Sequence, residues 1–124
     1  MKVIATESAP KAVGPYSQGI EYNNTIFYSG QIGINPATAK LEVGFESQLK
    51  QILINIDALL SARSLKREHI IKTTIFVTDL SKFSLVNQAY EQFFKAPYPA
   101  RSTVQVSALP LGSEIEIEVI ARTV

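Results

Sequence analysis

The chain has 124 residues, of which 46% are hydrophobic and 19% are charged. This length suits one domain, and a composition this apolar excludes an intrinsically disordered chain. The chain has no cysteine and a single histidine, His69. Disulfides, thiolate metal sites and a cysteine nucleophile are therefore excluded, and a multi-histidine metal site or a histidine triad is hard to build within one chain. The net charge of +1 gives no preference for nucleic acid or an anionic membrane.

No apolar run approaches the ~20 residues of a membrane helix. The first residues, Met1 to Glu7, contain an acidic residue and no long apolar stretch, which argues against a signal peptide. We therefore expect a cytoplasmic protein with neither a membrane nor a nucleic acid as its partner. The composition shifts nowhere along the chain, which predicts one continuous domain over residues 1–124.

The first part of the chain predicts a loop followed by a hairpin. Residues 7–15 contain two prolines and a glycine, which is typical of a loop. Two β-rich runs, 16–22 and 25–34, flank Asn23-Asn24, and asparagine tolerates the positive φ that tight hairpin turns need. A short additional strand at Val3-Ile4 fits the same pattern.

Two amphipathic helices are expected. Apolar residues recur at helical spacing between Phe45 and Leu60, which predicts a helix over roughly residues 44–62. Its end lacks the glycine expected near a C-cap. A second helix, roughly 82–95, can be capped by Asp79 or Ser81 and cannot continue through Pro97 and Pro99. Its buried stripe comprises Phe83, Val86, Tyr90, Phe93 and Phe94.

Three further strands are predicted at 70–78, 102–106 and 114–122, with a turn at 109–112. The order of elements is then β-β-α-β-α-β-β. This order predicts an α+β fold in which two helices pack on one face of a mostly antiparallel sheet.

The last strand alternates strictly between apolar and acidic residues. Because side chains alternate faces along a strand, one set should face the helices and the other should form a row of carboxylates. We expect Ile115, Ile117 and Val119 on the helix side, and Glu114, Glu116 and Glu118 on the opposite side, where Ile120 breaks the polar row. On the preceding strand we expect Val104 and Val106 on the core side, and Arg101, Thr103 and Gln105 beside the glutamates.

This polar face has two interpretations. It can be a solvated outer face, as antiparallel sheets often have, with an ordinary surface salt bridge between Arg101 and a carboxylate. It can instead meet another subunit and form a polar cleft, in which an arginine fork is suited to bind a small carboxylate ligand through two hydrogen bonds.

Several motifs taken together resemble one family. They are Gly14-Pro15-Tyr16-Ser17-Gln18, Ser29-Gly30-Gln31-Ile32, Lys72-Thr73-Thr74-Ile75-Phe76-Val77, Asn87-Gln88-Ala89-Tyr90-Glu91-Gln92-Phe93-Phe94, Pro99-Ala100-Arg101-Ser102-Thr103-Val104 and Ile115-Glu116-Ile117-Glu118. In this order and spacing the chain resembles the Rid (YjgF) family of enamine/imine deaminases, and most of all its RidA branch. The resemblance extends over essentially the whole chain.

The resemblance implies a chorismate-mutase-like α+β subunit and a homotrimer with three clefts at the subunit interfaces. It implies hydrolysis of 2-imino or 2-enamino acids, such as 2-iminobutanoate and 2-iminopropanoate, to 2-oxo acids and ammonia. These substrates arise from amino-acid dehydratases. It implies no cofactor and no metal.

Residue by residue, the resemblance makes Arg101 the ligand of the substrate carboxylate and Glu116 the acid that handles the attacking water or the leaving ammonia. Tyr16 reaches into the cleft with its hydroxyl, backbone groups of Gly30 and Thr103 contact the ligand, and Asn87 lines the cleft. Thr103 departs from the RidA branch, which commonly has cysteine there. His69 lies in a polar connection and is given no role.

Each of these residues also has a structural interpretation, in which Tyr16 packs a loop, Gly30 allows a close backbone approach and Asn87 is an exposed helix residue. Two other functions stay open at this point. The first is a non-catalytic trimer that binds metabolites such as 2-oxo acids. The second is a ribonuclease or translation inhibitor, which the sequence supports poorly because it shows no basic stripe and no histidine pair.

Overall fold

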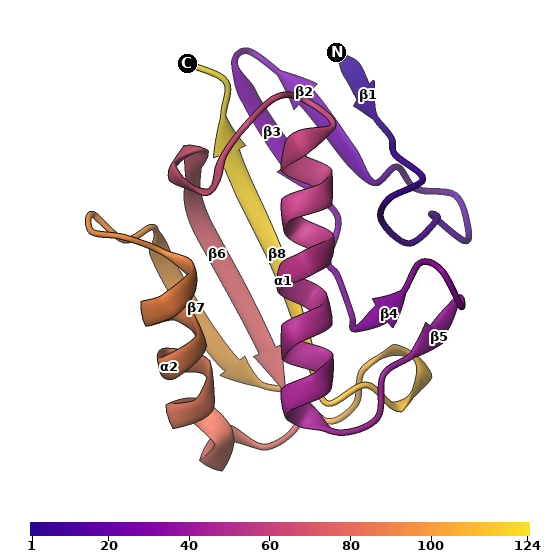
Figure 1. The fold of residues 1–124 in the computed structure, drawn as a ribbon, viewed down its shortest axis with the longest axis vertical. Coiled ribbons are helices and arrows are strands. Elements are labelled where there is room, and N and C mark those ends of the chain that lie inside the picture. Colours follow the sequence, from indigo (N-terminus) through magenta and orange to yellow (C-terminus); the bar gives the residue numbers. More distant parts are fainter.

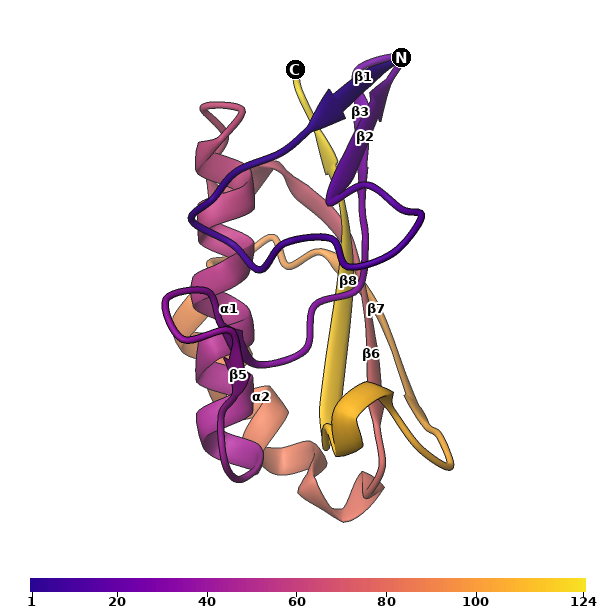
Figure 2. The ribbon, with the colours of Figure 1, turned by 90° about the vertical axis from the view of Figure 1, so that its right-hand side faces the viewer.

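The computed structural model describes residues 1–124 as a sheet with two helices on one of its faces (Figure 1 and Figure 2). The six-stranded sheet has the order β1-β2-β3-β8-β6-β7. Only β6 and β7 run parallel to one another. Its strands are β1 (Lys2–Ile4), β2 (Gly19–Tyr22), β3 (Thr25–Tyr28), β6 (Ile70–Val77), β7 (Ala100–Gln105) and β8 (Ile115–Arg122). The helices are α1 (Phe45–Ser61) and α2 (Phe83–Phe93), and a small second sheet pairs β4 (Ile34–Asn35) with β5 (Lys40–Leu41).

The α+β prediction is confirmed, and so are the hairpin and both helices. Asn23 and Asn24 adopt φ values of 49° and 60°, as a tight hairpin turn requires. The predicted strand 25–34 is too long, because β3 ends at Tyr28 and the chain then leaves the sheet before forming β4. At the end of α1, Ser64 takes the left-handed conformation usually left to glycine, with φ 58°, and the Leu65 amide donates to the Leu60 carbonyl.

The core lies between the helices and the inner face of the sheet. The strand β8 is central in the sheet, and its Ile115, Ile117 and Val119 are buried, as predicted. On the opposite face, Phe27 pairs with Ile120 in register, and Phe76 pairs with Glu116 and Val104. Phe27 is 51% exposed and Val104 is 42% exposed. The uncovered face is therefore a mixture of apolar and acidic side chains.

The predicted orientation of β7 is wrong. Arg101 and Thr103 pair in register with Thr73 and Ile75, which are buried on the helix side of β6. Val104 pairs with Phe76 on the uncovered face. Gln105 is also on the helix side, where its Oε1 accepts the Leu80 amide at 2.8 Å. The expectation failed because valine at an edge strand need not face the core, and alternation alone does not say which face is buried.

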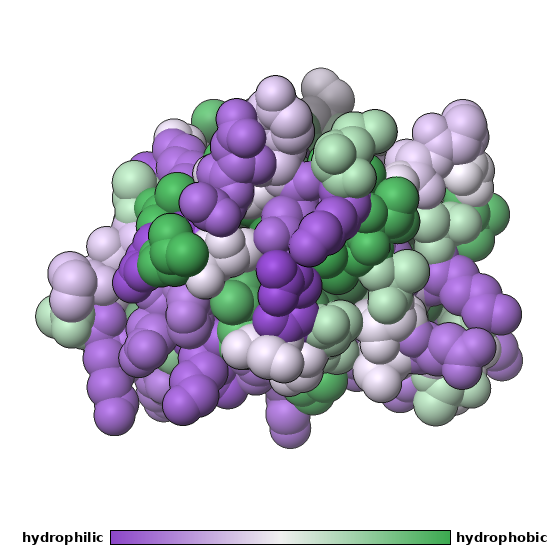
Figure 3. All heavy atoms as spheres, turned by 90° about the horizontal axis from the view of Figure 1, so that it is seen from above, coloured by the Kyte–Doolittle hydropathy of each residue, from purple (hydrophilic) through white to green (hydrophobic).

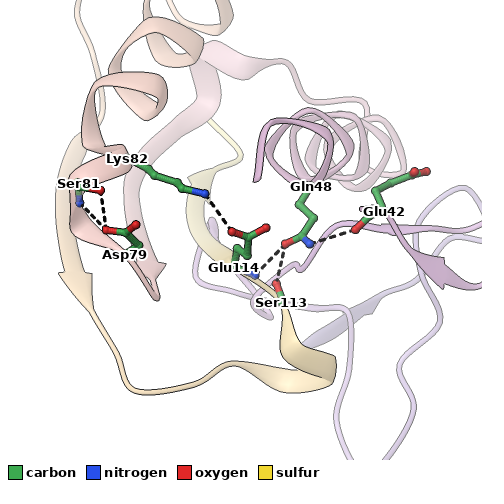
Figure 4. Close-up of polar contacts among 7 residues, drawn as sticks. All are labelled: Glu42, Gln48, Asp79, Ser81, Lys82, Ser113 and Glu114. Atoms are coloured by element: carbon green, nitrogen blue, oxygen red, sulfur yellow. Dashed lines mark hydrogen bonds and ion pairs between the residues drawn. The ribbon is translucent and has the colours of Figure 1, made fainter. Parts of the chain in front are cut away.

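Glu114 also differs from its prediction. It precedes β8, and its carboxylate forms an ion pair at 3.1 Å with Lys82, just before α2 (Figure 4). The carboxylate row on the uncovered face therefore consists of Glu116 and Glu118 alone.

A buried glutamine of α1 fixes the start of β8. The Gln48 amide donates to the Glu42 carbonyl at 3.0 Å, and its oxygen accepts the Glu114 amide at 2.8 Å and the Ser113 hydroxyl at 3.4 Å (Figure 4). Gly33 packs directly on this part of the helix, because a Cβ at Gly33 would lie 2.6 Å from the Gln48 Cα. This packing positions the strand that carries Glu116.

No helix of the chain is long and apolar enough to cross a bilayer. At the end of the molecule where both termini lie, hydrophilic and hydrophobic side chains are interspersed (Figure 3).

The close approach of Gly33 to α1 predicts that Gly33→Ala destabilises the fold. The added methyl group would overlap helix backbone that cannot move without moving α1, so we expect a loss of about 1–3 kcal/mol in the free energy of unfolding. Urea denaturation measures this loss. The control is Ser47→Ala, an exposed position beside Gln48, which should leave the midpoint nearly unchanged. An unaltered midpoint in Gly33→Ala would show that the helix yields to the extra carbon.

Candidate functional site

Arg101 is held on the helix side of the sheet by α2. Its Nη1 donates to the Asn87 Oδ1 at 2.8 Å, and it forms no salt bridge. Phe83 and Tyr90 contribute aromatic rings whose centroids lie 5.1 and 5.4 Å from the Arg101 Cζ, within the range of a cation–π contact. These three α2 residues follow the i, i+4, i+7 spacing of one helix face. The guanidinium is thus anchored at one nitrogen while its other donors are free.

Three buried hydroxyls without hydrogen-bond partners lie on the helix side of the sheet, on the elements that surround Arg101. They belong to Thr73, Tyr90 and Thr103. Tyr90 is only 6% exposed, and burial raises its pKa to about 12 despite the neighbouring Thr73 hydroxyl and the Arg101 charge, which both lower it. Buried polar atoms usually have partners, so an unsatisfied group of this kind marks a place where a ligand or water can bind.

Glu116 lies on the other face of the sheet and is half-buried there. Burial raises the pKa of its carboxyl, and the neighbouring Glu118 charge raises it further. No hydrogen bond or salt bridge from another side chain stabilises the ionised form. A carboxyl that holds its proton more tightly than usual is a stronger base when ionised, which suits it to proton transfer.

A second segment approaches Glu116 closely. Gln31 and Ile117 exchange backbone hydrogen bonds of 2.8 and 3.0 Å, which lays the preceding Gly30 beside β8. A Cβ at Gly30 would lie 2.9 Å from the Glu116 Cδ, so any larger residue would force the Glu116 carboxyl to move. Gly30 therefore approaches the Glu116 side chain closely, in addition to the backbone of β8.

Tyr16 belongs to the loop next to the Gly30 segment. The Ser29 hydroxyl, next to Gly30, donates to the Ser17 carbonyl at 2.6 Å, which fastens the loop that carries Tyr16. Tyr16 is 54% exposed, and its side chain forms no hydrogen bond within the chain. It borders a hollow of about 490 Å³ between the N-terminal segment and residues 16–18.

The predicted site residues thus form two groups. Arg101, Asn87 and Thr103 lie on the helix side of β7, whereas Glu116 and Gly30 lie at the uncovered face of β8, with the Tyr16 loop fastened beside them. One strand, β6, separates β7 from β8, and the pairing offsets Arg101 from Glu116 by three residues. Strand geometry then puts their backbones roughly 14 Å apart, with side chains on opposite faces.

Two larger hollows of about 630 and 890 Å³ lie elsewhere, along α1 and α2 and near residues 92–99. Neither is lined by Arg101 or Glu116. Neither of these hollows therefore contains either group of candidate residues. No three side chains of the metal-binding types gather anywhere in the chain. His69 lies at the end of a 3₁₀ turn, where its Nδ1 accepts the Lys66 amide at 3.0 Å.

Sequence reasoning missed the roles of Phe83, Tyr90 and Thr73 around Arg101. The first two were assigned to the core by their spacing; Tyr90 is indeed buried, but the assignment of Phe83 was wrong, because it is 37% exposed at the start of α2. Phe83, Asn87 and Tyr90 follow i, i+4, i+7 spacing, which puts them on one face of α2. This spacing was the signal in the sequence from which the positions of Phe83 and Tyr90 beside Asn87 could have been predicted. Thr73 could be found only from the register of β6 with β7.

The chain matches known proteins over almost its whole length. The family model described as Endoribonuclease L-PSP matches residues 6–123. The chain is 49% identical over 123 residues to the 2-iminobutanoate/2-iminopropanoate deaminase of Escherichia coli K12, covering 97% of this chain and 96% of that one. It is 44% identical over 121 residues to the human protein of the same name, covering 97% of this chain and 88% of that one.

Solved structures are similar over the same length. The crystal structure of RidA from the Antarctic bacterium Psychrobacter sp. PAMC 21119 superposes with a TM-score of 0.95 at 41% identity, covering 98% of this chain and 99% of that one. The match of the family model, the identities and the shared fold together show that the chain belongs to the Endoribonuclease L-PSP family, which is the Rid (YjgF) family that its motifs resemble.

Proposed function

We propose that the protein hydrolyses 2-imino and 2-enamino acids, such as 2-iminobutanoate and 2-iminopropanoate, to 2-oxo acids and ammonia. The observation that carries this proposal is the guanidinium of Arg101, which Asn87 anchors while no carboxylate of the chain neutralises it. A planar fork with free donors is the group best suited to bind a small carboxylate through two parallel hydrogen bonds. The names of the relatives in Escherichia coli and human support the same substrate class.

The reaction needs little beyond positioning and one proton-transfer group. Arg101 binds the substrate carboxylate and orients the electrophilic imine carbon. Water forms a bond to the carbon of the protonated imine while one of its protons passes to the Glu116 carboxylate, giving a neutral carbinolamine. The protonated Glu116 then passes this proton to the nitrogen and the C–N bond breaks, releasing ammonia. The Glu116 carboxylate takes the remaining hydroxyl proton as the carbonyl group of the 2-oxo acid forms. The raised pKa of Glu116 supports the proton-accepting steps, because such a carboxylate is a stronger base than an exposed one.

The two groups of residues cannot act on one small substrate within a single chain, because they occupy opposite faces of the sheet. We infer that one subunit supplies Arg101 and Asn87 and that its neighbour supplies Glu116 and the Tyr16 loop. The first subunit also supplies the backbone groups of Thr103, and the neighbour supplies those of Gly30. Exposed Phe27, its half-buried partner Ile120 and exposed Val104 support an interface on the uncovered face. The homotrimer is the assembly that the resemblance implies.

The first prediction concerns the geometry of the Arg101 fork. Arg101→Lys keeps the charge but loses the planar pair of donors, so we expect roughly ten- to a hundredfold lower turnover with the fold retained. A coupled assay measures this, with a threonine dehydratase generating the imine and its decay followed with and without the protein. His69→Ala is the control and should be fully active. Full activity of Arg101→Lys would indicate that Arg101 has a structural role and does not bind the substrate carboxylate as a planar fork.

The second prediction tests the division of the site between subunits. Arg101→Ala and Glu116→Gln should each be nearly inactive, whereas their co-assembled mixture should regain activity. In a closed ring with random mixing, each site takes its two residues from adjacent subunits, so roughly a quarter of the sites become intact. Sedimentation equilibrium should give a mass three times that of the chain. An inactive mixture would mean that both residues come from the same chain.

The third prediction follows from the raised pKa of Glu116. The folded chain holds this proton more tightly than the unfolded chain, so ionisation of Glu116 removes stability as the pH rises through the raised pKa. Glu116→Gln should therefore raise the thermal midpoint at neutral pH, and the gain should vanish well below the ordinary glutamate pKa. Glu118→Gln, at an exposed neighbour, should give a smaller gain. An equal or larger rise in the thermal midpoint for Glu118→Gln would mean that burial of the ionised Glu116 carboxylate destabilises the fold very little.

A further inference from the structure

The segment that leads to Tyr16 has almost no regular structure. Between the end of β1 at Ile4 and the start of β2 at Gly19 the chain forms only turns and irregular loop. Backbone groups in such a segment lack strand or helix partners and must be satisfied in another way. One buried side chain, that of Gln18, supplies much of what is missing.

The Gln18 amide joins the two ends of this segment. Its oxygen accepts the Thr6 amide at 2.7 Å. Its nitrogen donates to the carbonyls of Thr6 at 3.0 Å and Pro10 at 2.8 Å, with the Ala9 carbonyl at 3.5 Å. Gln18 is only 6% exposed, so its amide is shielded from competing water, although the bonds to Thr6 and Pro10 are partly buried. The contact with Pro10 closes a loop of residues 10–18, which is the length of a compact Ω-loop and contains Tyr16.

Ser29 fastens the same loop from the sheet side. Its hydroxyl donates to the Ser17 carbonyl at 2.6 Å, and its amide donates to the Gln18 carbonyl at 2.9 Å. The Tyr16 side chain forms no hydrogen bond of its own, and its amide donates only to the nearby Gly14 carbonyl at 2.9 Å. The location of the Tyr16 ring therefore depends on the backbone that Gln18 and Ser29 hold.

We propose that Gln18 is a positioning residue that closes the loop 10–18 and thereby holds Tyr16 beside the Glu116 part of the site. This inference rests on the proposed function, in which Tyr16 reaches into the cleft. Gln18 itself touches no substrate. Its removal changes the reaction through the freedom that the Tyr16 loop gains, and a misplaced catalytic group lowers the rate steeply.

The test uses Gln18→Met, which keeps the length of the side chain and removes the amide. The control is Gln88→Met, at an exposed position of α2. Amide hydrogen exchange of Thr6, whose N–H donates to Gln18, should become at least tenfold faster in Gln18→Met alone, while the amides of β6 and β8 keep their protection. Imine hydrolysis should fall roughly ten- to a hundredfold in kcat/KM.

A double-mutant cycle with Tyr16→Phe separates positioning from a general structural role. If Gln18 acts through the Tyr16 hydroxyl, Gln18→Met should cost roughly twofold or less once that hydroxyl is gone. An equal loss in both backgrounds would overturn the inference. If Gln18→Met does not fold, Ser29→Ala carries the same cycle, because it releases the loop without touching the buried amide.

The two proposals fail in different ways. Unchanged Thr6 exchange or full activity in Gln18→Met would overturn the role of Gln18 while imine hydrolysis by the wild-type protein still stands. A wild-type protein that hydrolyses no imine would overturn the proposed function and the catalytic part of this inference. The exchange of the Thr6 amide would then still decide whether Gln18 closes the loop.

Discussion

The parallel pairing of β7 with β6 is the constraint on which the candidate site depends. Because α2 connects these two strands, it lies against them, and its Asn87 meets Arg101 where the register puts Arg101 beside buried Thr73. A shift of this register by one residue would turn Arg101 to the uncovered face and bring Ser102 against the helix. One register thus decides which partners the arginine has and which of its donors are free.

The uncovered face has features that do not stabilise the fold of an isolated chain. Glu116 is half-buried beside another carboxylate, and Gly30 approaches it so closely that a larger residue there would displace the Glu116 carboxyl. Exposed Phe27 and Val104 lie on the same face. Shifted pKa values and exposed apolar surface of this kind concentrate where proteins bind ligands or partners. The proposed neighbouring subunit would cover the apolar residues and complete the cleft with its own Arg101, which binds the substrate carboxylate.

Two buried glutamines hold the irregular segments around the sheet. Gln48 binds backbone and side-chain groups near Ser113 and Glu42, and Gln18 binds those between Thr6 and Pro10. A glutamine amide suits this purpose because it donates and accepts without carrying a charge, so its burial costs less than that of an ion. The loops before β2 and before β8 are therefore fixed mainly by the hydrogen bonds of a few side chains rather than by strand pairing.

The sequence by itself determined the helices, the hairpin and the core face of β8, because each depends on local periodicity or on the φ preference of asparagine. It also identified Arg101, Glu116 and Tyr16 as candidates through their motifs. It could not orient β7, since alternation defines two faces without saying which is buried, and the valine at position 104 suggested the wrong one. Only the tertiary structure put Arg101 and Glu116 on opposite faces, because strand order and register arise from contacts between residues far apart in the chain.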